Sequence, residues 1–294
     1  MKRMRALFFG DNNEWRAGWR IAAMFVLVAV AVTLINVGWR TMGLPGQRTS
    51  TAWQFLAFTI LIAGATLAII VLLLRYFEKR GSDAIWLPFD MSAWKLTAIG
   101  TALGAVPICL MLGLAVAAGY GTVTPGNFNA AGLLAVLLPT LIAGFLFAGW
   151  EELVLRGYLL RQLSLGLNPL AAIIVTGVVF GLLHSGNPGA NWQGLLYTAI
   201  GGVLMALLVF RYGSLWLMIG YHFGWNATAS GVFGLEVSGL EGKVSVFVSA
   251  LTGSDWLTGG DYGFEAALPT VAIELLVLSV VLFTSRKSGL RSVP

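Results

Sequence analysis

Residues 52–74 read AWQFLAFTILIAGATLAIIVLLL and contain no charged side chain. The run is longer than the roughly 20 residues that an α-helix needs to cross a bilayer. The whole chain has a similar character, since 57% of its 294 residues are hydrophobic and only 11% are charged. A typical soluble domain has about 25% charged residues. A soluble fold of this composition could not cover its surface with polar side chains, so the chain is predicted to lie in a membrane.

Eight apolar runs, each bounded by charge, glycine or proline, are long enough to be candidate membrane spans. They cover residues 21–39, 52–74, 96–120, 131–162, 168–186, 192–210, 213–234 and 264–284. No small-residue cleavage site follows the first run before Arg40, so we interpret that run as a retained helix rather than a signal peptide. The predicted fold class is an all-α polytopic membrane protein, a bundle of about eight transmembrane helices.

The basic residues predict the orientation of the bundle, because cytoplasmic connections are enriched in Lys and Arg. With the N-terminus inside, fourteen of these residues fall on the inner side and three on the outer side; Arg156 is set aside because it lies within a predicted helix. Both termini are therefore predicted to be cytoplasmic, in a multi-pass protein of the plasma (inner) membrane. A nucleic-acid partner is not expected, since the basic residues sit in short clusters between apolar runs.

The chain is expected to form one domain, without internal repeats. The expected division is a basic tail over 1–20, a transmembrane helical domain over 21–285 and a second basic tail over 286–294. One long outer connection, residues 235–263, is acidic and rich in Gly and Ser, and we expect a loop or a surface helix there. The single cysteine, Cys109, lies within an apolar run, which excludes an internal disulfide and a cysteine-based metal cluster.

A few ionisable side chains lie inside the predicted spans. Each costs at least about 2.5–3.5 kcal/mol on insertion scales and needs a partner or a function. They are Glu151, Glu152, Arg156, His184, His222 and Glu274. This set includes both histidines of the chain, so it is the place to look for chemistry. Glu274 is expected to face the bundle or a crevice, without a catalytic role.

Glu151, His184 and His222 are expected at one depth. A turn signal at Asn168 lies midway between residues 151 and 184, so two antiparallel helices joined there would bring Glu151 and His184 to the same level. Counted from the basic residues that mark the inner boundary, Glu151 and His222 both lie roughly 15 Å inside it. Three helices thus deliver a carboxylate and two imidazoles to one level.

Helical spacing assigns the remaining polar side chains to faces. Glu152 and Arg156 are four residues apart and are expected to pair, which leaves the preceding glutamate free on another face. His222 and Asn226 are also four apart, so an imidazole and a carboxamide project from one stripe. Phe180 lies one turn before the histidine of its own span and is expected to form an aromatic floor for it.

A carboxylate and two imidazoles in a wet pocket predict hydrolysis. Glu151 and a histidine are suited to general-base activation of water, while the second histidine and Asn226 could donate hydrogen bonds to the oxyanion formed at a carbonyl. Alternatively, Glu151, His184 and His222 are three ligands of a divalent metal ion such as zinc, with an open position for the nucleophilic water. The residues alone leave both mechanisms open.

The predicted spans lack the catalytic residues on which other kinds of intramembrane hydrolase depend. All five aspartates of the chain lie outside the predicted spans, which disfavours a paired-aspartate protease. The chain contains no H-E-x-x-H stretch for a zinc helix and no G-x-S-G stretch for a nucleophilic serine.

Three short motifs occur in order along separate spans. Glu151–Arg156 reads EExxxR, Phe180–His184 reads FxxxH, and His222–Asn226 reads HxxxN. Together they resemble the CPBP family of intramembrane proteases, also called the Abi family, which comprises CAAX prenyl endopeptidases and bacteriocin-processing enzymes. The resemblance covers about residues 140–230, which are the expected catalytic core.

The resemblance implies a role for each matched residue. Glu151 would be the catalytic glutamate that activates water with His184, while His222 and Asn226 would stabilise the oxyanion. The glutamate and arginine expected to pair would support the site. In this family the mechanism has been interpreted both as a glutamate-type and as a metal-dependent protease. A membrane-associated or lipidated peptide or protein is the implied substrate.

Two other functions fit an apolar bundle with a polar pocket. One is a non-catalytic membrane scaffold that uses the pocket to bind a partner protein. The other is a proton-coupled transporter, in which Glu and His side chains relay protons. Such transporters often carry inverted repeats, which we do not find in this chain. The intact motifs favour the peptidase.

Overall fold

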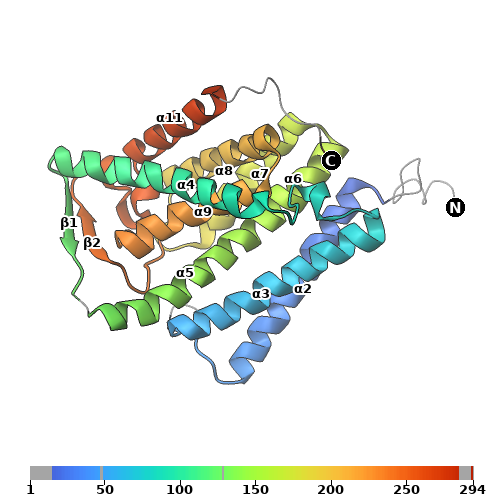
Figure 1. The fold of residues 1–294 in the computed structure, drawn as a ribbon, viewed down its shortest axis with the longest axis horizontal. Coiled ribbons are helices and arrows are strands. Elements are labelled where there is room, and N and C mark those ends of the chain that lie inside the picture. Colours follow the sequence, from blue (N-terminus) through green and yellow to red (C-terminus); the bar gives the residue numbers. More distant parts are fainter. Residues whose placement is uncertain (1–14, 47–48, 128, 285–292, 294) are drawn as a thin grey trace.

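A computed structural model describes residues 15–46, 49–127, 129–284 and 293. The two predicted basic tails, 1–20 and 286–294, fall largely outside the described residues. The described chain is a bundle of long helices, shown in Figure 1.

The helices are α2 (Ala17–Thr41), α3 (Ala52–Leu72), α4 (Ser92–Ala117), α5 (Ala130–Glu152), α6 (Leu160–Gly166), α7 (Pro169–Leu183), α8 (Trp192–Tyr212), α9 (Leu215–Asn226), α10 (Asp255–Thr258) and α11 (Leu268–Thr284). Three π-helical segments extend or join them: η1 (Leu73–Glu78), η3 (Leu153–Leu159) and η5 (Ala227–Val232). The 3-10 helices are η2 (Ser82–Ile85), η4 (His184–Gly186), η6 (Gly260–Tyr262) and η7 (Phe264–Ala266).

The predicted fold class, an all-α polytopic membrane protein, is confirmed. Six helices of the described residues are long and apolar enough to cross a membrane: Ala17–Thr41, Ala52–Glu78, Ser92–Ala117, Ala130–Gly166, Pro169–Gly186 and Trp192–Tyr212. The last two predicted spans also fold as helices, but α9 has 12 residues and α11 has 17. Their crossing of the membrane stays a prediction.

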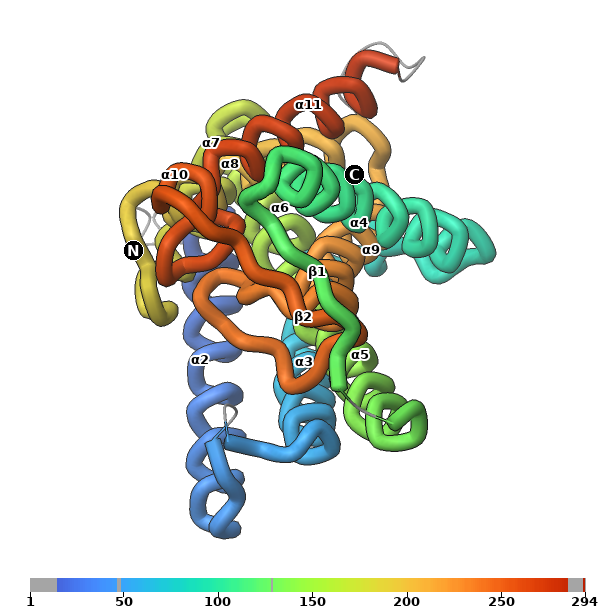
Figure 2. The backbone as a smooth tube through the Cα atoms, turned by 90° about the vertical axis from the view of Figure 1, so that its left-hand side faces the viewer, coloured from blue at the N-terminus to red at the C-terminus, as the bar shows by residue number. Residues whose placement is uncertain are grey.

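The connection 235–263, which is predicted to be outer, contains a β-strand in addition to loop and the short helix α10. This strand, β2 (Phe247–Leu251), pairs antiparallel with β1 (Gly121–Pro125), which lies between α4 and α5. Figure 2 shows the two strands side by side. Both are only five residues long. The pairing joins segments far apart in the sequence, so no local pattern predicted it.

The connections alternate between the two ends of the bundle. At one end, the carboxylate of Glu78 accepts hydrogen bonds from Arg20 of α2 and Arg161 of α6. At the opposite end, Nζ of Lys243 donates a hydrogen bond of 2.7 Å to the carbonyl of Ser50. This alternation is the one that the predicted topology requires; the side that faces the cytoplasm stays a prediction.

Two of the basic residues that we counted as inner boundary charges are buried. Arg20 and Arg161 are 7% and 3% exposed, and both form ion pairs with the buried Glu78. Tyr158 and Gln162 also donate hydrogen bonds to this carboxylate. A buried charge is tolerated when it is paired in this way. Arg161 therefore does not mark the aqueous boundary, and α6 continues past it.

Helices α4 and α9 pack backbone against backbone. The crossing uses pairs of glycines four residues apart, Gly100 and Gly104 on α4 and Gly220 and Gly224 on α9. A methyl group at Gly104 would overlap the carbonyl oxygen of Tyr221, and one at Gly224 would overlap that of Thr101. Small residues at this spacing are typical of close helix packing in membranes. The crossing holds α9, which carries two of the predicted site residues, in place.

Gly104→Ala is expected to lower the free energy of unfolding by about 1–3 kcal/mol, the usual cost of overpacking. Gly113→Ala on the same helix is the control, because no heavy atom lies within 4 Å of the added methyl group. Thermal unfolding in detergent measures both. Equal unfolding temperatures for the two variants would show that the α4–α9 crossing tolerates a side chain.

Candidate active site

A cavity of about 520 Å³ lies inside the bundle, with walls from α2, α5, α8, α9 and α11. The four predicted catalytic residues all line it: Glu151, His184, His222 and Asn226. Glu151 is near the end of α5, His184 follows α7, and the other two are on α9. The structure therefore brings these four side chains to one cavity; their catalytic roles stay predictions.

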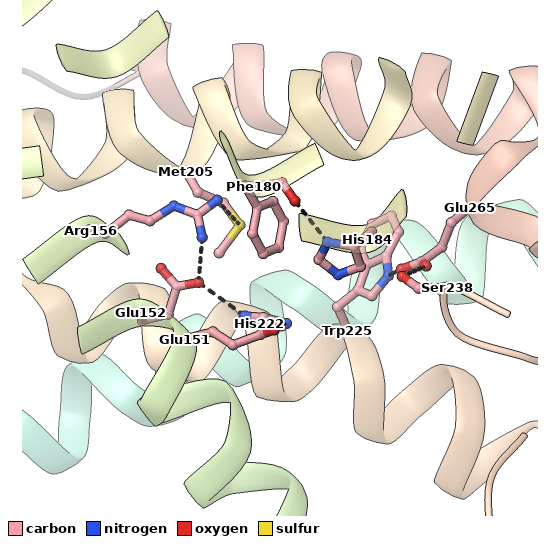
Figure 3. A network of polar contacts seen from close by, with 10 residues as sticks. All are labelled: Glu151, Glu152, Arg156, Phe180, His184, Met205, His222, Trp225, Ser238 and Glu265. Carbon is pink, nitrogen blue, oxygen red and sulfur yellow. Dashed lines mark hydrogen bonds and ion pairs between the residues drawn. The ribbon is translucent and has the colours of Figure 1, made fainter. Parts of the chain in front are cut away.

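Glu152 and Arg156 form the predicted ion pair. Nη1 of Arg156 lies 2.9 Å from Oε1 of Glu152, and both side chains are fully buried. The same Glu152 oxygen also lies 3.0 Å from Nδ1 of His222, a contact that we did not predict. Figure 3 shows Glu152 between these two partners. This carboxylate therefore links α5 and the following π-helical turn η3 to α9.

Phe180 lies at the centre of this network. Its ring is 4.7 Å from that of His184 and 5.9 Å from that of His222, in edge-to-face geometry in both cases. The predicted aromatic floor is confirmed. The ring also lies 4.1 Å from the guanidinium carbon of Arg156. Gly202 leaves space for this stack, because a methyl group there would lie 3.1 Å from both Phe180 and Arg156.

Hydrogen bonds determine which nitrogen of each imidazole carries a proton. Nδ1 of His184 lies 2.8 Å from the carbonyl oxygen of Phe180, and a carbonyl only accepts, so Nδ1 is the donor. Nδ1 of His222 donates to Glu152 in the same way. In the neutral form of either ring, Nε2 is then the unprotonated nitrogen. Both histidines are thus oriented by a second partner, as is typical of catalytic imidazoles and of metal-ligating imidazoles.

Glu151 is close to His222. Its Oε2 lies 3.5 Å from Nε2 of His222, longer than a usual direct hydrogen bond of about 2.7–3.2 Å. Among the described residues, no hydrogen bond or ion pair joins Glu151 to His184. Glu151 is thus free of the Arg156 ion pair and close to one of the two imidazoles with which it is predicted to share a level. The Glu151 side chain is 18% exposed and that of Glu152 is not exposed, which makes Glu151 the accessible carboxylate.

The predicted three-ligand metal set is not assembled. In the part of the chain that the structure describes, no group of three His, Cys, Asp or Glu side chains is arranged to hold a metal ion. Nδ1 of each histidine donates to a protein acceptor, which leaves Nε2 as the nitrogen that could bind a metal ion. Zinc binding by Glu151, His184 and His222 stays a prediction.

Two further carboxylates line the cavity. Glu274 is 7% exposed and accepts a hydrogen bond of 3.0 Å from the hydroxyl of Tyr221, so the expectation that it faces the bundle is confirmed. Glu265 accepts one of 2.7 Å from Nε1 of Trp225. Sequence reasoning missed Glu265, which lies at the first turn of an apolar run beside an acidic connection. The only sequence feature that pointed to Glu265 was its position inside the last predicted span, residues 264–284.

The fold and the site define a polytopic membrane protein whose internal cavity holds a carboxylate and two oriented imidazoles. Residues 129–228, which contain all three motifs, match the family model described as type II CAAX prenyl endopeptidase Rce1-like. The match confirms the resemblance to the CAAX-protease family over this segment.

A curated relative is the uncharacterized protein YyaK of Bacillus subtilis (strain 168). It is 30% identical over 168 residues, which cover 55% of this chain and 52% of the relative. The chain thus spans about half the length of the curated relative that it matches. No solved structure matches the chain.

Proposed function

We propose that the protein is an intramembrane endopeptidase of the CAAX-protease-like type, which hydrolyses a peptide bond of a membrane-associated or lipidated peptide or protein. The observation that carries the proposal is the convergence of Glu151, His184, His222 and Asn226 on one cavity. The family match over residues 129–228 supports the peptidase class. The proposed location of this multi-pass protein is the plasma (inner) membrane.

Glu151 is the general base in the proposed mechanism. Its carboxylate removes a proton from a water molecule that His184 orients through Nε2, and the water oxygen attacks the carbonyl carbon of the scissile bond. The carbon–nitrogen bond then breaks, and the protonated Glu151 returns the proton to the leaving amine. The accessibility of Glu151 beside the fully buried Glu152 supports this division of roles.

His222 and Asn226 stabilise the oxyanion in this proposal. The carboxamide of Asn226 donates one hydrogen bond. His222 donates through Nε2 only as an imidazolium, because Nδ1 already donates to Glu152. The carboxylates at its two ring nitrogens, 3.0 and 3.5 Å away, balance the charge of that imidazolium. Preorganised donors of this kind stabilise the charge that develops in the transition state.

The composition of the cavity wall supports an apolar substrate. α2 contributes only apolar side chains to it: Phe25, Val28, Ala29 and Val32. Most of the remainder of α2 is exposed at the bundle surface. A substrate segment embedded in lipid, or carrying a lipid, would pack against this wall.

We propose a mechanism without a metal ion; in support, no group of three possible ligands among the described residues is arranged to hold one. Cleavage by purified protein is therefore expected to persist after dialysis against a chelator. Loss of cleavage on chelation, with recovery on addition of zinc, would contradict the metal-free mechanism.

The proposal is tested by comparing peptide termini in the membranes of cells that carry either the wild-type chain or Glu151→Ala at equal abundance. New termini are expected only with the wild type. Glu241→Ala, at an exposed glutamate outside the cavity, is the control. Identical termini in the wild-type and Glu151→Ala membranes would contradict a peptidase and favour the scaffold.

A further inference from the structure

Two carboxylates of the cavity differ from the other glutamates inside the bundle. The buried carboxylates of Glu78 and Glu152 are paired with arginine side chains. Among the described residues, neither Glu265 nor Glu274 forms an ion pair with any arginine or lysine, and no arginine or lysine lines the cavity. Charged groups inside membrane proteins are usually paired. The partners of these two carboxylates among the described residues are neutral hydrogen-bond donors.

Helix α9 places both carboxylates next to the proposed catalytic stripe. Tyr221 and Trp225, one turn apart, donate the hydrogen bonds to Glu274 and Glu265. Each is directly followed in the sequence by a member of the proposed oxyanion pair. Residues four apart share a helix face and successive residues differ by about 100°, so the two carboxylates lie along one side of the proposed catalytic stripe.

Thr270 is a second observation that points to a ligand at this wall of the cavity. It lies one turn before Glu274 on α11, is 2% exposed and lines the same cavity. Its hydroxyl oxygen is buried and has no hydrogen-bond partner among the described residues. Buried polar groups are normally hydrogen-bonded, so a ligand in the cavity would supply the partner. Gly201 leaves space beside Glu274, since a methyl group there would lie 3.1 Å from Oε1.

The chemistry of this wall suits a cation. Carboxylates bind ammonium and guanidinium groups through charge-assisted hydrogen bonds, and the rings of Tyr221 and Trp225, which also line the cavity, attract a cation through their π faces. We propose that Glu265 and Glu274 bind a positively charged nitrogen of the substrate peptide close to the scissile bond. This deepens the proposed function and rests on it. A lysine or arginine side chain and a free N-terminal ammonium share this chemistry.

The test measures peptide binding separately from cleavage. Full-length protein carrying Glu151→Gln is placed in liposomes with fluorescent peptides that share an apolar anchor and differ at one scanned position, which holds lysine, norleucine or glutamate. At one position the lysine peptide is expected to bind roughly tenfold more tightly than the norleucine peptide. Peptides with a free or an acetylated N-terminus distinguish a side chain from the terminal ammonium.

Adding Glu265→Gln and Glu274→Gln is expected to reduce this preference to about one. Adding Glu241→Gln, the same change at an exposed site outside the cavity, is expected to keep it. If the double change impairs folding, Glu265→Gln alone should still lower the preference. A glutamine there keeps an oxygen that accepts from Trp225 and gains an N–H group that can donate to the hydroxyl of Ser238, so both local contacts survive. Thermal unfolding monitors each variant.

Cleavage of the same peptides by the chain with Glu151 intact separates the two proposals. If lysine peptides bind preferentially but no peptide is cleaved, the peptidase fails and the cation site stands. If peptides are cleaved without preference for lysine, the cation site is overturned and the peptidase stands. Equal or undetectable binding of lysine and norleucine peptides at every position also overturns the cation site, as does a preference that survives the glutamine substitutions.

Discussion

Glu151→Gln is expected to lower kcat for peptide cleavage by about 10²–10⁴-fold, the usual contribution of a general base. Glutamine has the size of glutamate but cannot take a proton from water. Because the contact of Glu151 with His222 is long, at 3.5 Å, the substitution should leave the fold and the binding of peptide unchanged. Initial rates of purified protein in liposomes, with KM measured separately, give the effect.

The matched control for this prediction is Glu241→Gln, at an exposed position of the outer connection. It makes the same chemical change outside the cavity and is expected to retain the wild-type rate. A Glu151→Gln protein that cleaves at the wild-type rate would remove Glu151 from the mechanism. A loss that appears only in KM would assign it to binding instead.

Glu152→Leu is expected to lower the free energy of unfolding by about 3–5 kcal/mol, as is usual when one partner of a buried ion pair is removed. The substitution leaves the guanidinium of Arg156 buried without its carboxylate. It also removes the acceptor for Nδ1 of His222, so cleavage should fall as well. Thermal or chemical unfolding in detergent and the cleavage rate measure the two effects.

The double variant Glu152→Leu with Arg156→Met separates the effect of Glu152 on stability from its effect on the orientation of His222. Replacing a whole buried ion pair by apolar side chains is often neutral for stability, so most of the lost stability should return. Cleavage should not return, because His222 still lacks the acceptor that orients its ring. Recovery of both properties together would mean that Glu152 acts only by pairing with Arg156.

The parts of the molecule that sequence predicted well are local. Charge-free runs such as 52–74 indicate membrane helices because a run of this length can cross a bilayer with its backbone hydrogen bonds satisfied within the helix. The Glu152–Arg156 pair was predicted because residues four apart on a helix are neighbours whatever surrounds them. For the same reason, a turn signal at Asn168 correctly indicated the reversal between α6 and α7: its side chain caps the N-terminus of α7.

The features that sequence did not predict depend on how helices pack. The contact between Glu152 and His222 requires the α5–α9 geometry, and the position of Glu265 requires Trp225 to face it. The charge pattern predicts that Arg161 lies at the membrane boundary, because its partner, Glu78, is 83 residues away in the chain. The periodicity of a single helix gives no information about contacts between side chains of different helices.

The central claim is that Glu151, His184, His222 and Asn226 act together on one carbonyl group. An experimental structure of the Glu151→Gln protein with an uncleaved peptide in the cavity tests it most directly. The scissile carbonyl oxygen is expected within about 2.6–3.2 Å of donors from His222 and Asn226, with a water molecule held between residue 151 and His184. A peptide bound with its carbonyl groups away from α9, or a side chain at residue 151 turned toward the acyl chains, would contradict the claim.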